Sequence, residues 1–294
     1  MSKGITSLTI CIMMQITLFS LLIVNSNPAI SDTVVYEGQI ASDTIWDIGN
    51  SPYFIEGNIT VSEGVKLTIE AGCEVRFNGY YGLFIEGNLS AEGSPEAQIT
   101  FTSNRSSPTM NDWRGVQIDS KGTAKIRYCS IRYSEYAIYL NESSENDIQS
   151  NIISDNFDGI YIFRSSNNTI SYNDISNSIQ YGIFLSRSSN NHIQNNNISN
   201  NWEGIRLFFS SNNNISYNNI HDNPEAGIHL YSSESNNITS NSLISNGNFG
   251  VRLRFNSDNN IITKNNISTH ANGINLTSSS KNRIYENLLW NNEF

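Results

Sequence analysis

The fold of this chain is decided by one stretch, Asn168-Thr-Ile-Ser-Tyr-Asn-Asp-Ile-Ser176, which is followed shortly by Gly182-Ile-Phe-Leu185. Altered copies of this stretch fill residues 146–292. The glycine recurs at Gly159, Gly182, Gly204, Gly227, Gly250 and Gly273. An isoleucine recurs with the same period at Ile148, Ile170, Ile193, Ile215, Ile238, Ile262 and Ile284. Two independent marks with one period of 22–24 residues indicate a solenoid.

Each copy contains two short runs in which apolar residues alternate with polar ones, Ile-x-x-Asn-x-Ile and Gly-Ile-x-Leu. Alternation with period two predicts β-strands, and isoleucine suits a pleated surface. The remaining residues are mostly Ser, Asn, Asp and Gly, which favour turns. No copy has the apolar spacing of a helix, which argues against a leucine-rich repeat. We therefore predict an all-β fold, a parallel β-helix solenoid of about eleven rungs stacked about 4.8 Å apart.

One asparagine per copy occupies the same bend of the predicted coil. Asparagine tolerates a left-handed backbone, and stacked side-chain amides can form hydrogen bonds from rung to rung. We interpret this ladder as structural. Its members are Asn151, Asn173, Asn196, Asn218, Asn241, Asn265 and Asn287.

Three segments are expected along the chain. Residues 1–30 have a positive start and an uncharged apolar run, which predicts a signal peptide or, alternatively, an N-terminal membrane anchor. Residues 31–112 read as N-terminal capping rungs with a wider period, and residues 113–294 as the regular repeats. The last copy lacks its glycine strand, so either Trp290 and Phe294 fold over that rung or a partner covers it.

Three motifs together resemble a known group of proteins. They are Gly87-Asn-Leu-Ser-Ala-Glu-Gly93 with the following Ile-Thr-Phe, the step Trp113-Arg-Gly115, and the repeats themselves. They resemble the NosD-like right-handed parallel β-helix proteins of the pectin-lyase-like superfamily, over roughly residues 50–292. The resemblance implies a right-handed coil and an exported protein. It also implies one of several roles, namely carbohydrate binding or cleavage, a surface protein, or an accessory factor for copper-site assembly.

The residue between Ile and Leu of each glycine strand is predicted to point outward, one rung above the next. This column contains the candidate ligand-binding residues Tyr161, Phe184, Arg206, His229 and Arg252. Aromatic faces stack on sugar rings, and arginine matches a carboxylate or sulfate with two hydrogen bonds. The column therefore suggests a face for an acidic polysaccharide or another cell-surface glycan. The alternative is an ordinary solvated sheet face whose aromatic residues simply favour strands.

Two acidic residues precede repeat glycines two rungs apart, Asp158 and Glu203. Their expected separation of about 9.6 Å lies near the upper end of the range for an inverting carboxylate pair. The motifs of polygalacturonases and pectate lyases are absent, however, so we assign no catalytic residues. The four histidines do not share a repeat position in adjacent rungs, so no metal site or cofactor is predicted either. A net charge of −10 disfavours nucleic acid as a partner.

The sequence thus predicts a secreted or cell-surface module that presents a rigid face to polysaccharide and to which we assign no enzymatic activity. The alternatives are a polysaccharide hydrolase or lyase, and a NosD-like accessory protein for copper-site assembly. No membrane span is expected beyond the possible N-terminal anchor.

Overall fold

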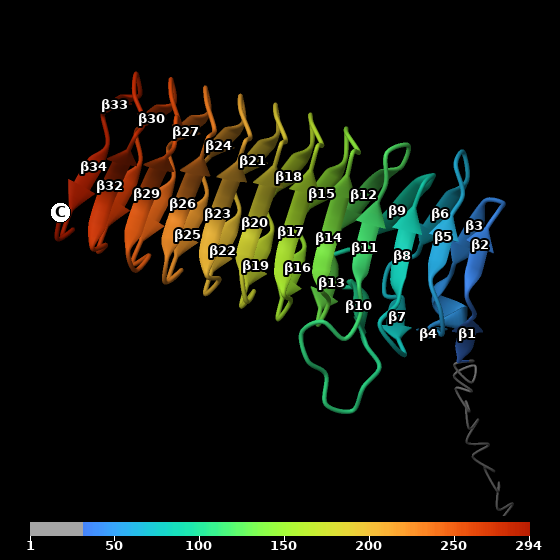
Figure 1. Cartoon of the computed structure of the whole chain (residues 1–294). Coiled ribbons are helices and arrows are strands. Elements are labelled where there is room, and N and C mark those ends of the chain that lie inside the picture. Colours follow the sequence, from blue (N-terminus) through green and yellow to red (C-terminus); the bar gives the residue numbers. More distant parts are fainter. Residues whose placement is uncertain (1–31) are drawn as a thin grey trace, which may run out of the picture.

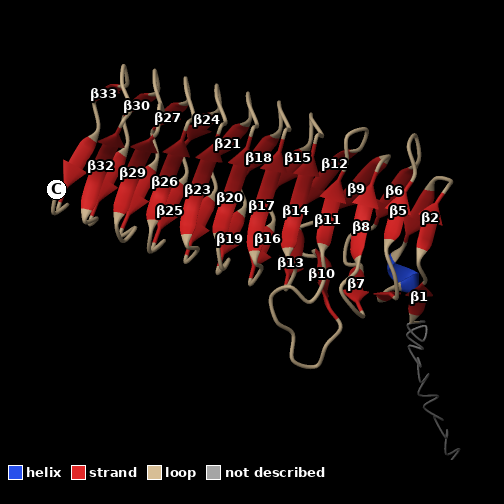
Figure 2. Cartoon of the chain, viewed as in Figure 1, coloured by secondary structure: helices blue, strands red, loops and turns tan. Residues whose placement is uncertain are grey.

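The computed structural model describes residues 32–294, and the predicted leader at residues 1–30 lies outside this range. The described residues form a single stack of coils (Figure 1). Nearly all of its regular structure is strand, and one short 3-10 helix, η1 (Ile48–Asn50), lies at the N-terminal end (Figure 2).

The strands belong to three parallel sheets that run the length of the stack. Sheet A consists of β1 (Thr33–Val35), β4 (Tyr53–Ile55), β7 (Glu74–Phe77), β10 (Ile99–Ser103), β13 (Cys129–Arg132), β16 (Ile152–Ser154), β19 (Asp174–Ser176), β22 (Asn197–Ser199), β25 (Asn219–His221), β28 (Ser242–Ile244), β31 (Asn266–Ser268) and β34 (Leu288–Trp290). Sheet B consists of β2 (Gly38–Ile40), β5 (Ile59–Val61), β8 (Gly82–Ile85), β11 (Gly115–Ile118), β14 (Tyr136–Asn141), β17 (Asp158–Phe163), β20 (Tyr181–Ser186), β23 (Glu203–Phe208), β26 (Ala226–Tyr231), β29 (Phe249–Arg254) and β32 (Asn272–Thr277). Sheet C consists of β3 (Thr44–Trp46), β6 (Lys66–Ile69), β9 (Asn88–Glu92), β12 (Thr123–Arg127), β15 (Asp147–Gln149), β18 (Thr169–Ser171), β21 (His192–Gln194), β24 (Asn214–Ser216), β27 (Asn237–Thr239), β30 (Ile261–Thr263) and β33 (Arg283–Tyr285).

Each strand pairs in parallel with the strand three places later in the chain, so one turn of the coil contains one strand of each sheet. The isoleucines of the repeat stack in register: Ile148 pairs with Ile170, which pairs with Ile193. All three are fully buried, and similar columns from the three sheets fill the interior. The predicted parallel β-helix of about eleven turns is confirmed.

The repeat glycines are required because the next turn of the coil approaches them closely. A Cβ atom added to Gly182 would lie 2.7 Å from the carbonyl oxygen of Gly204 and 2.7 Å from Cγ2 of Ile198. Such contacts are shorter than van der Waals distances, so a side chain would force the turns apart. The glycine therefore marks where each coil enters its sheet B strand.

The predicted asparagine ladder exists and is fully hydrogen-bonded inside the coil. Asn196 Oδ1 accepts from both the backbone N and Nδ2 of Asn173, each at 3.0 Å, and Asn196 Nδ2 donates to the Ile170 carbonyl. The expectation of a left-handed backbone at the ladder itself is wrong by one residue. The positive φ angles lie just before it, for example 58° at Tyr172 and 55° at Asn195. That preceding residue makes the bend, which leaves the asparagine side chain free to point inward.

The N-terminal turns are less regular than the later ones. Between β10 and β11 the chain makes a long loop that projects from the stack (Figure 1). The fully buried Trp113 ends this loop and stacks on Phe77, with ring centroids 4.0 Å apart. The division into capping rungs at 31–112 and regular repeats at 113–294 stays a prediction.

At the C-terminal end, the side chains of the last turn are exposed. Leu288 is 60% exposed, Trp290 51% and Phe294 88%, so Phe294 does not fold over this rung. A partner there stays a prediction. Residues 32–294 include no helix with the length and hydrophobicity needed to cross a membrane.

Candidate functional site

The five predicted ligand-binding residues lie side by side on the outer face of sheet B. Each occupies the same register position on consecutive strands, from β17 to β29. Tyr161 pairs with Phe184, Phe184 with Arg206, Arg206 with His229, and His229 with Arg252. We call this column, together with the side chains that contact it, the sheet B strip.

The first half of the strip is a ladder of aromatic rings. The ring centroids of Tyr139 and Tyr161 are 5.0 Å apart and those of Tyr161 and Phe184 4.9 Å, with nearly parallel planes in both pairs. Tyr136 and Tyr181 contact the ladder from one side with tilted rings. The five side chains are all partly exposed. The ladder therefore stabilises the stack and also presents ring surface and hydroxyl groups to solvent.

The second half begins with a cluster of Glu203, Arg206 and His229, in which Glu203 and His229 are buried and Arg206 is partly exposed. Arg206 Nη1 lies 2.9 and 3.1 Å from the two carboxylate oxygens of Glu203, and His229 Nδ1 lies 2.7 Å from Oε1. Burial alone would raise the pKa of the Glu203 carboxyl, but the hydrogen bonds and charges of His229 and Arg206 bring it below its ordinary value. Glu203 is therefore ionised at neutral pH.

His229 differs from the expectation that the whole column points into solvent. Its side chain occupies an outward register position but is only 2% exposed. The reason is its hydrogen bond to Glu203, together with the long side chains of Arg206 and Arg252 on the two neighbouring strands. The alternation in the sequence predicts on which face of a sheet a residue lies, but it does not predict how far neighbouring side chains bury that residue.

Arg252 is also paired with a carboxylate. Its Nη1 lies 2.8 Å from Glu225 Oε1, and its guanidinium lies 4.1 Å from the centroid of the Phe249 ring. Burial and the nearby Arg254 lower the pKa of Arg252 from its ordinary value. Because Glu203 and Glu225 offset Arg206 and Arg252, these four groups balance in charge, whereas the sequence column alone suggests a basic face.

Asp158, the second carboxyl considered in the sequence, lies beside the aromatic ladder. It is 4% exposed, and its Oδ1 accepts a hydrogen bond of 3.1 Å from the Tyr181 backbone. Burial raises the pKa of Asp158 to about 7, with a further contribution from the charge of Glu135. Asp158 and Glu203 stand two strands apart, with Tyr181 between them, as their sequence spacing predicts.

Two residues beside the column escaped the sequence analysis. Trp202 immediately precedes β23 and is 51% exposed. Glu225 immediately precedes β26 and neutralises Arg252. Both occupy the same repeat position, just before a strand of sheet B, which is a signal that the sequence offered.

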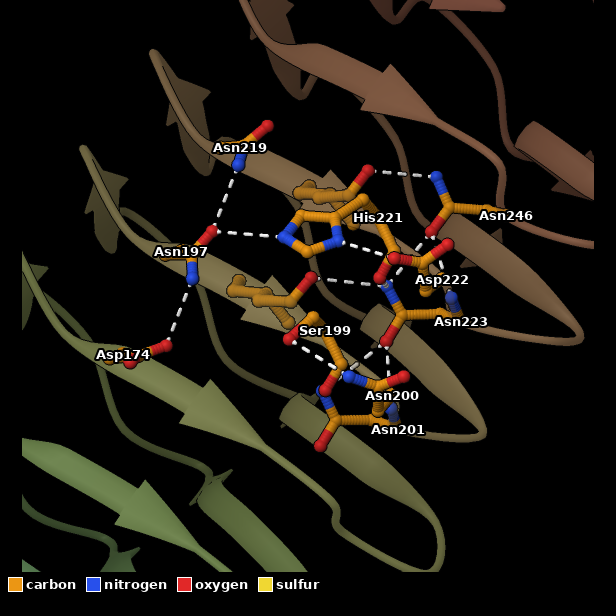
Figure 3. A network of polar contacts seen from close by, with 12 residues as sticks. Asp174, Asn197, Ser199, Asn200, Asn201, Asn219, His221, Asp222, Asn223 and Asn246 are labelled. Atoms are coloured by element: carbon orange, nitrogen blue, oxygen red, sulfur yellow. Dashed lines mark hydrogen bonds and ion pairs between the residues drawn. The ribbon is translucent and has the colours of Figure 1, made fainter. Parts of the chain in front are cut away.

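The histidines cannot converge on one ion, because they lie on different faces. His192 is on sheet C, His221 on sheet A and His229 on sheet B. Figure 3 shows that Asp174, Asn197 and Asn219 form a hydrogen-bonded row on sheet A, against which the His221 ring lies. Within residues 32–294, no group of three or more His, Cys, Asp or Glu side chains is arranged to hold a metal ion.

Comparison with solved structures shows the same architecture elsewhere. A mutant of the periplasmic alginate epimerase AlgG superposes with a TM-score of 0.65 and 19% identity, covering 88% of this chain and 77% of that one. The ORF18 protein of Geobacillus virus E2 gives a TM-score of 0.56 and 11% identity, over 88% and 54% of the two chains. The Dettilon tailspike protein gives 0.50 and 17%, over 86% and 68%. At these identities the likeness shows the fold alone.

Among curated proteins, Protein bark beetle of Drosophila melanogaster is 40% identical over 73 residues. This match covers 25% of the present chain but 2% of the fly protein.

Two family models match the chain, and each spans about half of it. The model described as "Right handed beta helix region" matches residues 114–267. The model described as "Periplasmic copper-binding protein (NosD)" matches residues 27–180. Together the two matches reach from the first described turn almost to the last. The chain therefore belongs to the right-handed parallel β-helix proteins of the NosD-like kind.

Proposed function

We propose that this protein is an extracytoplasmic module that binds polysaccharide on the sheet B strip without cleaving it. The observation that carries the proposal is the strip itself: a continuous aromatic ladder from Tyr139 to Phe184, followed by the partly buried polar cluster of Glu203, Arg206 and His229, on one sheet. Sugar rings combine apolar faces with hydroxyl groups, and such a surface complements both.

The comparisons support this reading at a coarser level. AlgG is described as a periplasmic epimerase of alginate, which is a polysaccharide. The NosD family is also described as periplasmic. The apolar run predicted to export the chain agrees with a location outside the cytoplasm, secreted or at the cell surface.

The proposal is tested by removing the rings of the ladder. The double variant Tyr161→Ala, Phe184→Ala removes two stacked side chains from the strip. We expect the double variant to bind the polysaccharide that the full-length chain retains best about tenfold more weakly, or weaker still. A tenfold loss of affinity corresponds to about 1.4 kcal/mol, which is the scale of the contribution that aromatic contacts make. Binding is measured by affinity electrophoresis or calorimetry on a panel of acidic and neutral polysaccharides.

Tyr172→Ala is the matched control, because Tyr172 is 61% exposed but lies in the bend between sheets C and A. It should bind like the unchanged chain. Thermal melting of every variant shows whether the coil is intact. Equal affinity of the folded double variant and the control would refute the proposal.

A polysaccharide hydrolase or lyase is a second candidate, and one observation favours it. The pKa of Asp158 is raised and that of Glu203 lowered, and carboxyl groups with opposite shifts can divide the roles of acid and base. Chain shortening of the bound polysaccharide, lost in Asp158→Asn and Glu203→Gln, would support this candidate.

A copper role finds no support in the described residues. The family description names copper, yet the histidines lie on separate faces and residues 32–294 hold no cluster of potential ligands. These side chains do not fit a copper site.

A further inference from the structure

Two arginines beside the sheet B strip have no acidic partner. Arg187 immediately follows β20 and is exposed, and Arg254 is the last residue of β29 and is partly exposed. Neither guanidinium forms an ion pair with any of residues 32–294. In this they differ from Arg206 and Arg252, each of which faces a glutamate. Arg187 and Arg254 are therefore free to bind an anion from solution.

The other charged residues at this edge of the sheet leave the two arginines unpaired. Arg164, one turn before Arg187, is itself paired with Glu142 at 2.9 Å. Glu234 and Asp258 lie further round the bends between sheets B and C, and within the described chain neither carboxylate pairs with a cation. An external anion thus meets no competing carboxylate at either guanidinium.

The two arginines border a column of outward side chains that runs beside the strip. In this column Ser186 pairs with Phe208, and Phe208 pairs with Tyr231. Tyr231 in turn pairs with Arg254. Arg187 directly follows Ser186, so the two arginines stand three turns apart, about 14 Å along the axis. A ligand that contacts both is therefore an extended molecule that lies along the coil.

A cluster of four aromatic rings occupies the turns between the arginines: Phe208, Phe209, Tyr231 and Phe255. These rings meet at an angle, 79° between Phe208 and Phe209 and 65° between Phe209 and Tyr231. Phe209 is 49% exposed and Phe255 42%. Arg254 lies over the Phe255 ring, 4.8 Å from its centroid, which holds the guanidinium beside the cluster. Exposed rings that do not stack on one another leave apolar surface on which a sugar can pack.

We propose that Arg187 and Arg254 are anion subsites, and that the ligand is an acidic polysaccharide whose carboxylate or sulfate groups contact them while the sugars between pack on the aromatic cluster. A guanidinium binds either group with two parallel hydrogen bonds. The inference rests on the proposed function and narrows it to acidic polymers. It places the recognition of charge at the edge of sheet B, and not at Arg206 and Arg252, where the sequence suggested it.

The test variant is Arg187→Ser, Arg254→Thr, which removes both charges with residues that other turns of the coil use. Ser232 occupies the bend position of Arg187 and has the same left-handed backbone, with φ of 47° against 51°. Thr277 pairs with Arg254 in register on the next strand of sheet B. Both substitutions are therefore compatible with the local backbone, and thermal melting checks that the coil is intact.

The matched control Lys125→Ser, Arg132→Ser removes the same net charge from the other two sheets. Lys125 pairs in register with Ser90 on sheet C, and Arg132 with Ser154 on sheet A. Both residues are exposed. The full-length proteins are titrated with polygalacturonate and its fully methyl-esterified form, and with dextran sulfate and dextran, at low and high salt. Each pair compares one sugar chain with and without its charge.

We expect the unchanged chain and the control to bind at least one acidic polymer more tightly than its neutral counterpart. This binding should weaken at high salt, because salt screens exposed charges. The test variant should bind the same polymer about fivefold more weakly, or weaker still, and with less dependence on salt.

Equal binding of the charged and neutral polymers would overturn the acidic ligand. Equal losses in the test variant and the control would show attraction by overall charge and would overturn the two subsites. Normal binding by the test variant, when the Tyr161→Ala, Phe184→Ala variant has lost binding, would overturn the subsites and leave the proposed function standing. Retention of none of the four polymers would overturn the proposed function as well.

Discussion

Asn196 shows at the scale of one residue how the coil is held together. Its Oδ1 serves two donors of the turn before, and its Nδ2 reaches Ile170 and the next ladder residue, Asn218. Because the side chain is 1% exposed, water cannot replace these bonds. The sequence period predicted this ladder. It could not place the left-handed residue, because the choice between neighbouring positions depends on which side chain points inward.

Asn196→Leu should therefore destabilise the protein strongly. The change keeps the side-chain size but leaves buried backbone and amide groups without partners, each at a cost of about 1–3 kcal/mol. We expect the free energy of unfolding to fall by about 3 kcal/mol or more, measured by urea denaturation. Asn219→Leu, an exposed outward position on the following sheet A strand, should change it by less than about 0.5 kcal/mol. Similar losses for the two variants would contradict the structural role of the ladder.

At the scale of the element, the structure contains more ladders than the one that the sequence revealed. A second asparagine ladder runs between sheets B and C through Asn168, Asn191 and Asn213. A third, between sheets A and B, runs through Asn201, Asn223 and Asn246 (Figure 3). In the third ladder His270 replaces an asparagine: Nε2 contacts Asn246 Nδ2 at 3.2 Å, and Nδ1 contacts Asn292 Oδ1 at 3.0 Å. The ring must then be neutral, with its proton on Nδ1.

The presence of a histidine at this ladder position predicts that acid destabilises this turn of the coil. Burial lowers the pKa of His270 below its ordinary value of 6.5, although the bond to Asn292 opposes the shift. A lowered pKa means that the folded protein resists protonation. The contribution of His270 to stability is thus complete above about pH 6.5 and is lost as the pH falls from there through the folded-state pKa.

His270→Asn should restore the regular ladder and remove this titration. We expect the variant to be at least as stable as the unchanged chain at pH 7.5, and its advantage to grow on acidification to pH 5. Urea denaturation at both pH values measures the difference. A constant difference between the two proteins would show that His270 does not titrate on unfolding.

At the scale of the whole molecule, the repeat determines the fold because every turn buries the same side chains in the same register. The column from Tyr161 to Arg252 was predictable for the same reason, since alternation puts these residues on one face of one sheet. The pairing of Arg252 with Glu225 and the burial of His229 were not predictable. Both depend on side-chain conformations and on how the bends place acidic residues beside the strands. The sequence therefore suggested a basic face, whereas Arg206 and Arg252 are offset by Glu203 and Glu225 in the folded strip.

The most direct test of the account is a side-chain footprint of the full-length protein with the polysaccharide that it retains best. Hydroxyl-radical labelling, read by mass spectrometry, compares residues on the strip with exposed residues elsewhere. We predict protection of Tyr161, Phe184 and Trp202 by the polysaccharide and unchanged labelling of Tyr172 and Tyr217, which lie between sheets C and A. Protection of Tyr172 and Tyr217 instead, or no protection of the strip at saturating polysaccharide, would contradict binding on the sheet B strip.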